Sequence, residues 1–449
     1  MPYEGELADS RSLRRFEHDP RLKAVLAELD RRQNGSSIAL PACSSVKPSG
    51  WLPDYLIAID GSLHELPLKG GFPGAQVCFY SIVSVLLMTA KMREADRERP
   101  IPPVRFKELE DAEAMTAVLT GANVVRAGEI DPKAAFRRYL FQALDTNGVD
   151  TRAETLLQTY EHLASFRPTS GRPAKCPYRD QCGDPSQPFR QLGGEYQCSC
   201  NLKRNVFSTD SLDVQNSMRE SGENGRMFGE ALQVIENLWL LNVIRYYTQR
   251  LDVKALANLA FIMDGPLRID GEPAWLSQAI KKELRRLNDD IRARGGKDLL
   301  LLGIEKTGNF VEHLKLLDQQ GTGSPDNLPP QTVYLLTNQY IRNNIAFGDR
   351  RYGEVTYFGR KIFYKTKTKA LICATVPFLH EGDDDTDRAD PAQFQRLDDI
   401  LTILDQLASA RYPNAIIPVL AAHAECSIPL TQGRKVLEML TKESSSVLT

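Results

Sequence analysis

This sequence contains no apolar run long enough to cross a membrane, for which about 18 consecutive residues are needed. Its N-terminal stretch, MPYEGELADSRSLRRFEHD, lacks the apolar segment of a secretory signal. It has no P-loop motif, which argues against ATP hydrolysis through such a loop. The net charge of −2 over 449 residues neither favours nor excludes a nucleic-acid partner. We therefore expect a cytoplasmic protein that does not insert into membranes.

The composition can support a sizeable core, since hydrophobic residues make up 42% of the chain, and the length allows two or three domains or one large domain with insertions. We predict an N-terminal helical extension over 1–50 and an α/β domain over 51–449, with a Cys-rich insertion at 167–205. Apolar periodicity predicts strands at 55–60, 76–88, 260–264, 298–304 and in a hairpin over 353–376, and helices at 108–119, 132–166, 226–249, 273–294, 308–318 and 394–408. The alternation of helices and strands in the second half favours a partly parallel, mixed sheet with flanking helices.

Two apolar runs each end in Asp-Gly. Asp60 follows the run 56–59, and Asp264 follows the run 260–263. A short apolar run of this kind is typical of a buried strand, so each carboxylate is expected at the rim of the sheet. Two carboxylates on adjacent strands can share a hard divalent cation, which prefers oxygen ligands. The alternative is that each Asp only starts a turn, because Asp-Gly is a common turn pair.

A third carboxylate is expected from the helix over 226–249, because two aspartates rarely suffice to hold two cations. Glu236 lies beside the apolar stripe of this helix, whereas Glu230 lies among polar residues. An ionised carboxylate among apolar side chains is costly unless it is paired or bound to metal. Glu236 is therefore the better candidate ligand, and Glu230 is the second. Alternatively, Glu236 sits at the edge of the stripe and reaches water.

Two more side chains are candidates for the same centre. His423 lies in an apolar stretch near the C-terminus, where it could complete a cation site or carry a proton to a leaving group. It could equally be an ordinary core histidine. Lys306 follows the strand that ends at Ile304 and could meet the charge of a transition state. It could also be a solvated lysine.

In their order and spacing, these motifs resemble the NurA family of DNA-end-processing nucleases. They are DGS at 60–62, a Glu-bearing helix, DGP at 264–266, and the stretch from RYP to AAH that ends at His423. The resemblance covers roughly residues 50–440 and implies a ribonuclease-H-like fold. It also implies a site that depends on manganese or magnesium and consists of Asp60, Glu236, Asp264 and His423.

The resemblance further implies a substrate and partners. It implies cleavage of DNA, from ends and in single strands, by a homodimer that works with HerA, a hexameric DNA-translocating ATPase. The missing P-loop fits a nuclease that relies on a separate motor. Such hydrolysis needs no covalent intermediate, because bound cations can activate water and stabilise the leaving oxygen. DNA repair and defence against foreign DNA are both open as biological settings.

Four of the eight cysteines crowd into the insertion, at Cys176, Cys182, Cys198 and Cys200. Without a secretory signal, disulfides are not expected, and four thiolates suit a tetrahedral zinc ion. We therefore predict a structural zinc knuckle. The spacing departs from the usual pairs of cysteines two residues apart, so free thiols in a loop are the alternative.

A basic segment over 350–369 is the candidate DNA-binding surface. Its basic residues alternate with aromatic ones, and such segments neutralise phosphates and stack on unpaired bases. The candidate DNA contacts are Arg350, Arg351, Arg360, Lys361, Lys365 and Lys367. The alternative is an edge hairpin that its lysines keep soluble.

These features together predict a ribonuclease-H-like α/β deoxyribonuclease with a zinc-knuckle insertion. The main alternative is a catalytically idle subunit of the same fold that binds DNA or docks a motor. An idle subunit should lack at least one of the four candidate ligands, and all four are present. A zinc-ribbon regulator of nucleic acid would leave the two Asp-Gly strands unexplained.

Overall fold

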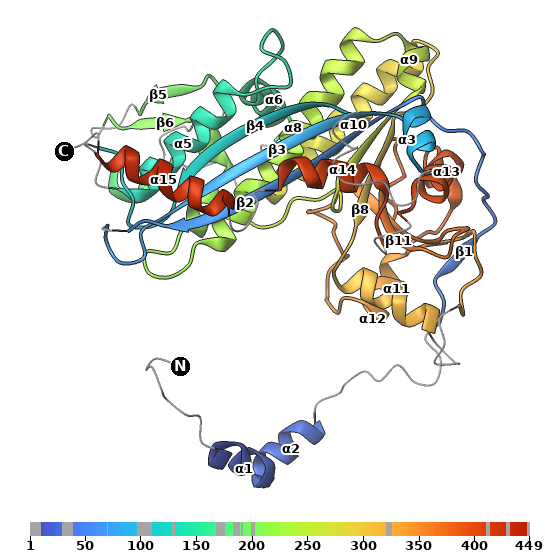
Figure 1. The fold of residues 1–449 in the computed structure, drawn as a ribbon, viewed down its shortest axis with the longest axis horizontal. Helices are drawn as coiled ribbons and strands as arrows, with labels where there is room; N and C mark the ends of the chain where they lie inside the picture. The colour runs from blue at the N-terminus through green and yellow to red at the C-terminus, as the bar shows by residue number, and fades with distance from the viewer. Residues whose placement is uncertain are drawn as a thin grey trace.

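A computed structural model describes residues 10–28, 39–69, 71–96, 110–127, 131–167, 176–182, 189, 192–198, 203–319, 326–409, 414–427 and 432–446. Within these residues the centre is a mixed sheet of nine strands, in the order β1-β9-β10-β11-β8-β7-β2-β3-β4 (Figure 1). The strands are β1 (Ala42–Ser44), β2 (Tyr55–Pro67), β3 (Gln76–Met88), β4 (Glu110–Thr120), β7 (Leu259–Asp264), β8 (Leu300–Glu305), β9 (Thr332–Leu335), β10 (Gly359–Lys365) and β11 (Leu371–Pro377). A small antiparallel ribbon consists of β5 (Glu195–Gln197) and β6 (Asn205–Phe207).

The middle of the sheet is parallel. β2 pairs in parallel with β7, and β7 pairs in parallel with β8, while all other neighbours in the sheet are antiparallel. β7 and β8 are almost wholly buried apolar runs, as expected for strands covered on both faces. β2 and β3 pair over their full length and continue into β4, which makes a long antiparallel wing on one side of the parallel core.

Helices cover both faces of the sheet. One face packs against α5 (Pro132–Thr146), α6 (Leu156–Ala164), α8 (Gly225–Arg250), α10 (Trp275–Ala293), α11 (Asn309–Gln319) and α12 (Asn338–Asn344). The other face packs against α3 (Thr89–Asp96), α13 (Leu397–Leu407) and α14 (Ile417–Cys426). The remaining helices are α1 (Ser10–His18), α2 (Pro20–Glu28), α7 (Arg179–Cys182), α9 (Val253–Ala257) and α15 (Gln432–Ser446).

The long helix α8 is buried on nearly all sides. It spans 26 residues, almost the range predicted, and sixteen of them are buried. A helix that is apolar around its whole circumference belongs to the core rather than to the surface. The sequence analysis assigned α8 a single apolar stripe, and the structure corrects this because α5, α6 and α10 pack around it.

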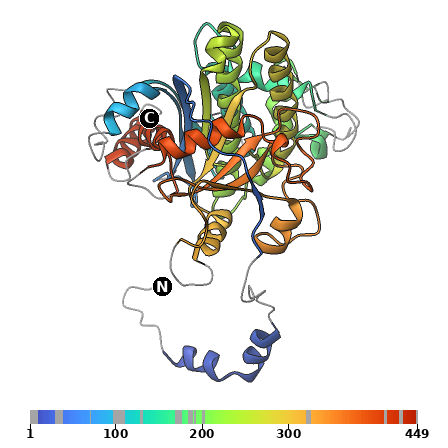
Figure 2. The same cartoon turned by 90° about the vertical axis from the view of Figure 1, so that its right-hand side faces the viewer.

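Three predicted elements differ from the structure. Residues 108–119 were expected to be helical, but 110–120 form the strand β4. The strand predicted at 55–60 runs on to Pro67. The sheet also includes residues 42–44, inside the predicted extension, because β1 pairs with β9. Helices α1 and α2 lie apart from the sheet (Figures 1 and 2). In addition, the single helix predicted over 132–166 is two helices, α5 and α6, with residues 147–155 between them. The other predicted helices and strands are present with shifts in their bounds.

None of the helices in the described ranges combines the length and the apolar character that a membrane span requires.

Candidate active site

Asp60 and Asp264 lie side by side on neighbouring parallel strands. The last residues paired between β2 and β7 are Ile59 and Met263, and the two aspartates follow directly. Because side chains alternate along a strand, both carboxylates point to the face that α14 covers. Asp264 ends β7, as predicted. Asp60 instead lies inside β2, paired with Val83 of β3. The neighbouring strand β7 ends at this level of the sheet, whereas β2 continues beyond it.

Helix α14 brings His423 onto the two aspartates. The His423 Nδ1 atom lies 2.8 Å from Asp60 Oδ2 and 3.9 Å from Asp264 Oδ2. The histidine side chain is 55% exposed, whereas the Asp60 side chain is 7% exposed. His423 is therefore not a core histidine: a buried carboxylate orients its ring, which stays accessible to solvent.

Glu236 lies on α8, which covers the opposite face of the sheet. It projects from α8 toward Gly61, where a Cβ atom would lie 2.4 Å from Glu236 Oε1. Burial, with the charges of Asp60 and Asp264, holds the pKa of Glu236 well above its ordinary value, and the Gly61 backbone N–H offsets this in part. By surface area Glu236 is half-buried, so it keeps some contact with solvent, as the alternative expectation had it. Its carboxylate lies within the electrostatic reach of both aspartates.

Lys306 supplies the positive charge at this centre. It follows β8, the strand next to β7, and its ammonium group forms an ion pair with Asp264. Burial and the neighbouring Asp60 raise the pKa of Asp264 to about 7, although Lys306 counteracts the rise. One lysine therefore does not neutralise the carboxylates that converge here.

Glu230, the second candidate for the third carboxylate, lies elsewhere. It is 5% exposed, and it accepts hydrogen bonds from Arg226 Nε at 2.9 Å and from Ser217 Oγ at 2.7 Å. The sequence placed Glu230 among polar residues, and the structure adds that it is buried. Ordinary partners satisfy its carboxylate, and the charges that perturb Glu236 do not include it.

Two residues of this centre escaped the sequence analysis. Gly61 leaves room for the Glu236 carboxylate beside β2. Cys426, at the end of α14, is buried with its thiol beside Asp60 and His423. The available signal for Cys426 was its position three residues after His423, which puts both side chains on one side of a helix.

The predicted DNA-binding segment is partly in the core. β10 lies between β9 and β11 and is buried along its whole length. The predicted hairpin is therefore inside the sheet, and the alternative of a hairpin at the sheet edge is wrong. Phe358, Phe363 and Tyr364 are fully buried and cannot stack on bases.

The prediction that Arg360, Lys361 and Lys365 contact DNA is wrong for the same reason, because each of these side chains is almost completely buried. Arg360 Nη1 donates to Gln393 Oε1 at 2.9 Å. Lys361 forms an ion pair with Glu305, and burial lowers the pKa of Lys361 to about 8. These cations have internal partners and are not available to a DNA backbone.

Lys365 lies between two acidic side chains. Its Nζ atom is 2.7 Å from Asp318 Oδ1 and 3.0 Å from Asp326 Oδ1. Arg350, Arg351 and Lys367 are exposed, and the structure leaves their predicted role open.

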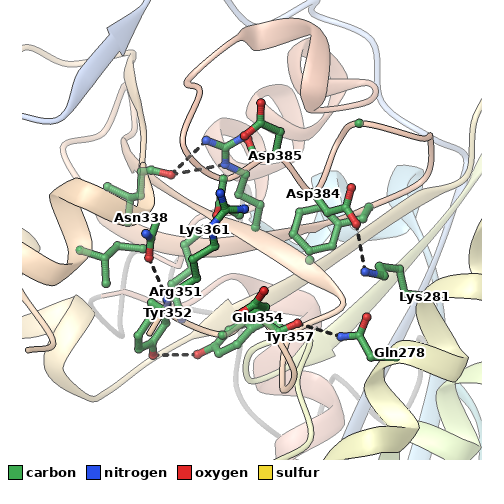
Figure 3. A pocket seen from close by; sticks show the side chains of 18 residues that line it. Gln278, Lys281, Asn338, Arg351, Tyr352, Glu354, Tyr357, Lys361, Asp384 and Asp385 are labelled. Carbon is green, nitrogen blue, oxygen red and sulfur yellow. Dashed lines mark hydrogen bonds and ion pairs between the residues drawn. The ribbon is translucent and has the colours of Figure 1, made fainter. Parts of the chain in front are cut away.

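A cavity of about 490 Å³ lies beside β10, and Arg351, Arg360 and Lys361 contribute to its wall (Figure 3). Its polar side chains bond to one another or to backbone, as when Lys281 Nζ meets Asp384 Oδ2 at 3.0 Å. The four predicted metal ligands are not among the residues that line it. The cavity is therefore separate from the acidic centre.

The cysteine-rich insertion is described in part. Cys176 and Cys198 are buried in one small cluster with Tyr178 and Val206, and Cys182 packs against it. Cys200 lies outside the described residues. The structure gathers three of the four predicted zinc ligands in one place, and the zinc itself stays a prediction.

Comparisons with known proteins add little to this geometry. No protein-family model and no curated protein matches the chain. Among solved structures, it is similar to the NurA nuclease from Sulfolobus solfataricus, with 11% sequence identity and a TM-score of 0.32 over 98% of both chains. A second crystal structure of NurA gives 11% identity and a TM-score of 0.28 over 97% of this chain and 98% of that one. TM-scores of this size do not establish a common fold.

Proposed function

We propose that this chain is a divalent-metal-dependent deoxyribonuclease of the NurA type, with a ribonuclease-H-like domain. The observation that carries the proposal is the electrostatic coupling of three carboxylates from three elements. Asp60 and Asp264 come from parallel strands, and Glu236, on the other face of the sheet, is close enough for their charges to raise its pKa. Carboxylates that only start turns would not be coupled in this way.

The donor set fits hard divalent cations. Asp60, Asp264 and Glu236 repel one another, which contributes to the raised pKa values of Asp264 and Glu236. Oxygen ligands of this kind suit Mn²⁺ or Mg²⁺, and bound cations would relieve the repulsion. These three carboxylates with His423 would hold the metal, which when bound activates water and stabilises a leaving oxygen.

His423 and Lys306 would also act on the substrate side. The Asp60 carboxylate orients the His423 ring, whose exposed edge can hold or deliver a proton where DNA approaches. Lys306 pairs with Asp264 and stands where it can offset negative charge that develops on a phosphate.

Partners and setting belong to the same proposal. Exposed Arg350, Arg351 and Lys367 would contact the DNA backbone. We propose a homodimer that cooperates with a HerA-type hexameric ATPase, in DNA repair or in defence against foreign DNA in the cytoplasm. The absence of a P-loop in the sequence supports a separate motor.

The test is cleavage of linear single- and double-stranded DNA with Mn²⁺ or Mg²⁺. Asp60→Ala and Asp264→Ala should each abolish cleavage while the circular dichroism spectrum stays native. Asp54→Ala removes an exposed carboxylate just before β2 and serves as the matched control. Near wild-type cleavage by either site variant would contradict the assignment. A wild-type protein that binds DNA but never cleaves it would indicate an idle subunit instead.

A structural zinc in the insertion is proposed separately. Elemental analysis after brief dialysis against a chelator should find about one zinc per chain, since one tetrahedral site uses ~4 thiolates. The double substitution Cys198→Ser and Cys200→Ser should remove it. Unchanged zinc content in that variant would exclude the cluster.

A further inference from the structure

Cys426 is buried at the acidic centre, although the proposed cleavage needs no thiol. It is the last residue of α14 and only 1% exposed. Its backbone carbonyl accepts a hydrogen bond from Ser62 Oγ at 2.5 Å, which fixes this end of the helix against β2. The thiol is therefore held in place beside the side chains of His423 and Asp60.

The three side chains have the spacing of a metal site. One ligating atom from each of Asp60, His423 and Cys426 lies within 4.8 Å of the other two. In tetrahedral zinc sites, bonds of about 2.0–2.3 Å put ligand atoms roughly 3.3–3.8 Å apart. The three groups need only small side-chain movements to close around one ion.

The chemistry of this trio differs from that of the three carboxylates. Carboxylate oxygens suit Mg²⁺ and Mn²⁺, whereas thiolate and imidazole favour softer ions such as Zn²⁺. A carboxylate, an imidazole and a thiolate together make a three-ligand zinc site, with a fourth position left for water or substrate. Asp60 belongs to both sets, so the two kinds of ion would compete for it.

We propose that Asp60, His423 and Cys426 form a soft-metal site that binds Zn²⁺ and thereby inhibits the centre. Coordination replaces the S–H bond of Cys426 with an S–Zn bond and releases one proton to solvent. The inhibitory consequence rests on the proposed nuclease function, but the binding does not.

Binding is tested with Cd²⁺, a soft ion whose bond to a thiolate gives an ultraviolet charge-transfer band. Wild-type protein, stripped of metal, is compared with Cys426→Ser and with Cys78→Ser, which changes a buried core cysteine on β3. Cys426→Ser should bind one Cd²⁺ fewer than the other two proteins, with a correspondingly weaker band. Equal uptake by all three proteins would overturn the proposal, whatever the insertion binds.

A second measurement does not depend on Cys426→Ser, in case that variant fails to fold. In ¹¹³Cd NMR, a cadmium ion with one sulfur ligand resonates apart from one with four. A one-sulfur resonance is expected, and it should disappear in His423→Ala. A spectrum with only sulfur-rich sites would overturn the proposal.

The inhibitory arm measures the Zn²⁺ concentration that halves Mn²⁺-dependent cleavage, relative to each variant's own rate without zinc. This half-inhibiting Zn²⁺ concentration should rise roughly 10–100-fold in Cys426→Ser, which is the loss of affinity typical when a residue that supports a metal site is removed. It should stay constant in Cys78→Ser. Equal zinc sensitivity would overturn the inhibitory role. If the wild-type protein cleaves nothing, the proposed function fails, while the cadmium measurements still decide the binding.

Discussion

Glu236 occupies the space that a side chain on residue 61 would need. Its Oε1 atom lies 2.4 Å from the position of a Cβ atom on Gly61, and its Cγ atom lies 2.7 Å away. Gly61 is inside β2, paired with Ile82, so it forms no turn. A glycine inside a strand often marks a close approach by another group. Here the absence of a side chain leaves room for the Glu236 carboxylate against β2.

Gly61→Ala should therefore disable the centre without unfolding the protein. The atoms in the way belong to the side chains of Glu236 and Ile82, which can move. We expect a stability loss of about 1–3 kcal/mol from overpacking, together with loss of DNA cleavage. The control is Gly229→Ala in α8, where a Cβ atom meets nothing within 4 Å. If Gly61→Ala cleaves DNA normally, Glu236 does not need this gap.

The metal-free protein should lose stability as the pH rises through neutrality. The pKa of Asp264 rises from 3.8 to about 7 on folding, so the folded state holds this proton more tightly than the unfolded state. The stabilisation is complete below pH 3.8 and is lost as the pH rises through about 7. It amounts to at most about 4 kcal/mol, at 1.36 kcal/mol per pKa unit.

This prediction is checked by urea unfolding with a chelator across that pH range, in the wild type and in Asp264→Asn. As the pH rises, the free energy of unfolding should fall more in the wild type than in the variant. Added Mn²⁺ should restore the stability that the wild type loses. Parallel pH profiles for the two proteins would show that Asp264 is not perturbed.

The two glutamates of α8 should behave in opposite ways. Glu236→Gln removes one of three repelling carboxylates, so it should abolish cleavage and maintain or raise metal-free stability. Glu230→Gln should cleave DNA but lose about 1 kcal/mol of stability, because exposed Arg226 and half-buried Ser217 lose an ionised acceptor. Cleavage assays and thermal melts on both variants decide the matter. Loss of cleavage in Glu230→Gln alone would move the third ligand to Glu230.

Among the basic residues of the segment 350–369, substitutions of buried residues should affect stability, and substitutions of exposed residues should affect DNA binding. Lys365→Met leaves Asp318 and Asp326 without their shared cation, and should destabilise the fold by about 3–5 kcal/mol. Arg350→Ala and Lys367→Ala remove exposed charges and should weaken DNA binding with little change in stability. Filter binding at two salt concentrations and thermal melts separate the effects. If Lys365→Met is well folded but binds DNA more weakly, Lys365 contacts DNA and the prediction is wrong.

The parts of the fold with strong periodicity were predictable. The strand that ends at Asp264 and the helix over 226–249 were placed nearly to the residue, because continuous apolar patterns leave few alternatives. Residues 108–119 were assigned wrongly, since Glu, Ala and Met favour a helix locally. Pairing with β3 overrides that preference, and local propensity does not contain this information.

For the centre, the sequence suggested the residues but not the way in which they meet. Two Asp-Gly pairs indicated Asp60 and Asp264, but only the register of β2 against β7 makes them neighbours. The basic alternation over 359–365 correctly predicted a strand. It could not show that β10 has strands on both sides, so charges that look solvated in the sequence are buried against distant acids.

Asp60 and His423 are 363 residues apart along the chain. During synthesis, the strands and helix that carry the three carboxylates leave the ribosome well before α14 does. A nascent chain could therefore build most of the sheet while its acidic cluster still lacks the histidine. Contacts of such long sequence separation also form late in folding. Under the proposed function, the chain would gain its complete acidic centre only once α14 has been made, which would delay any damage to DNA until then.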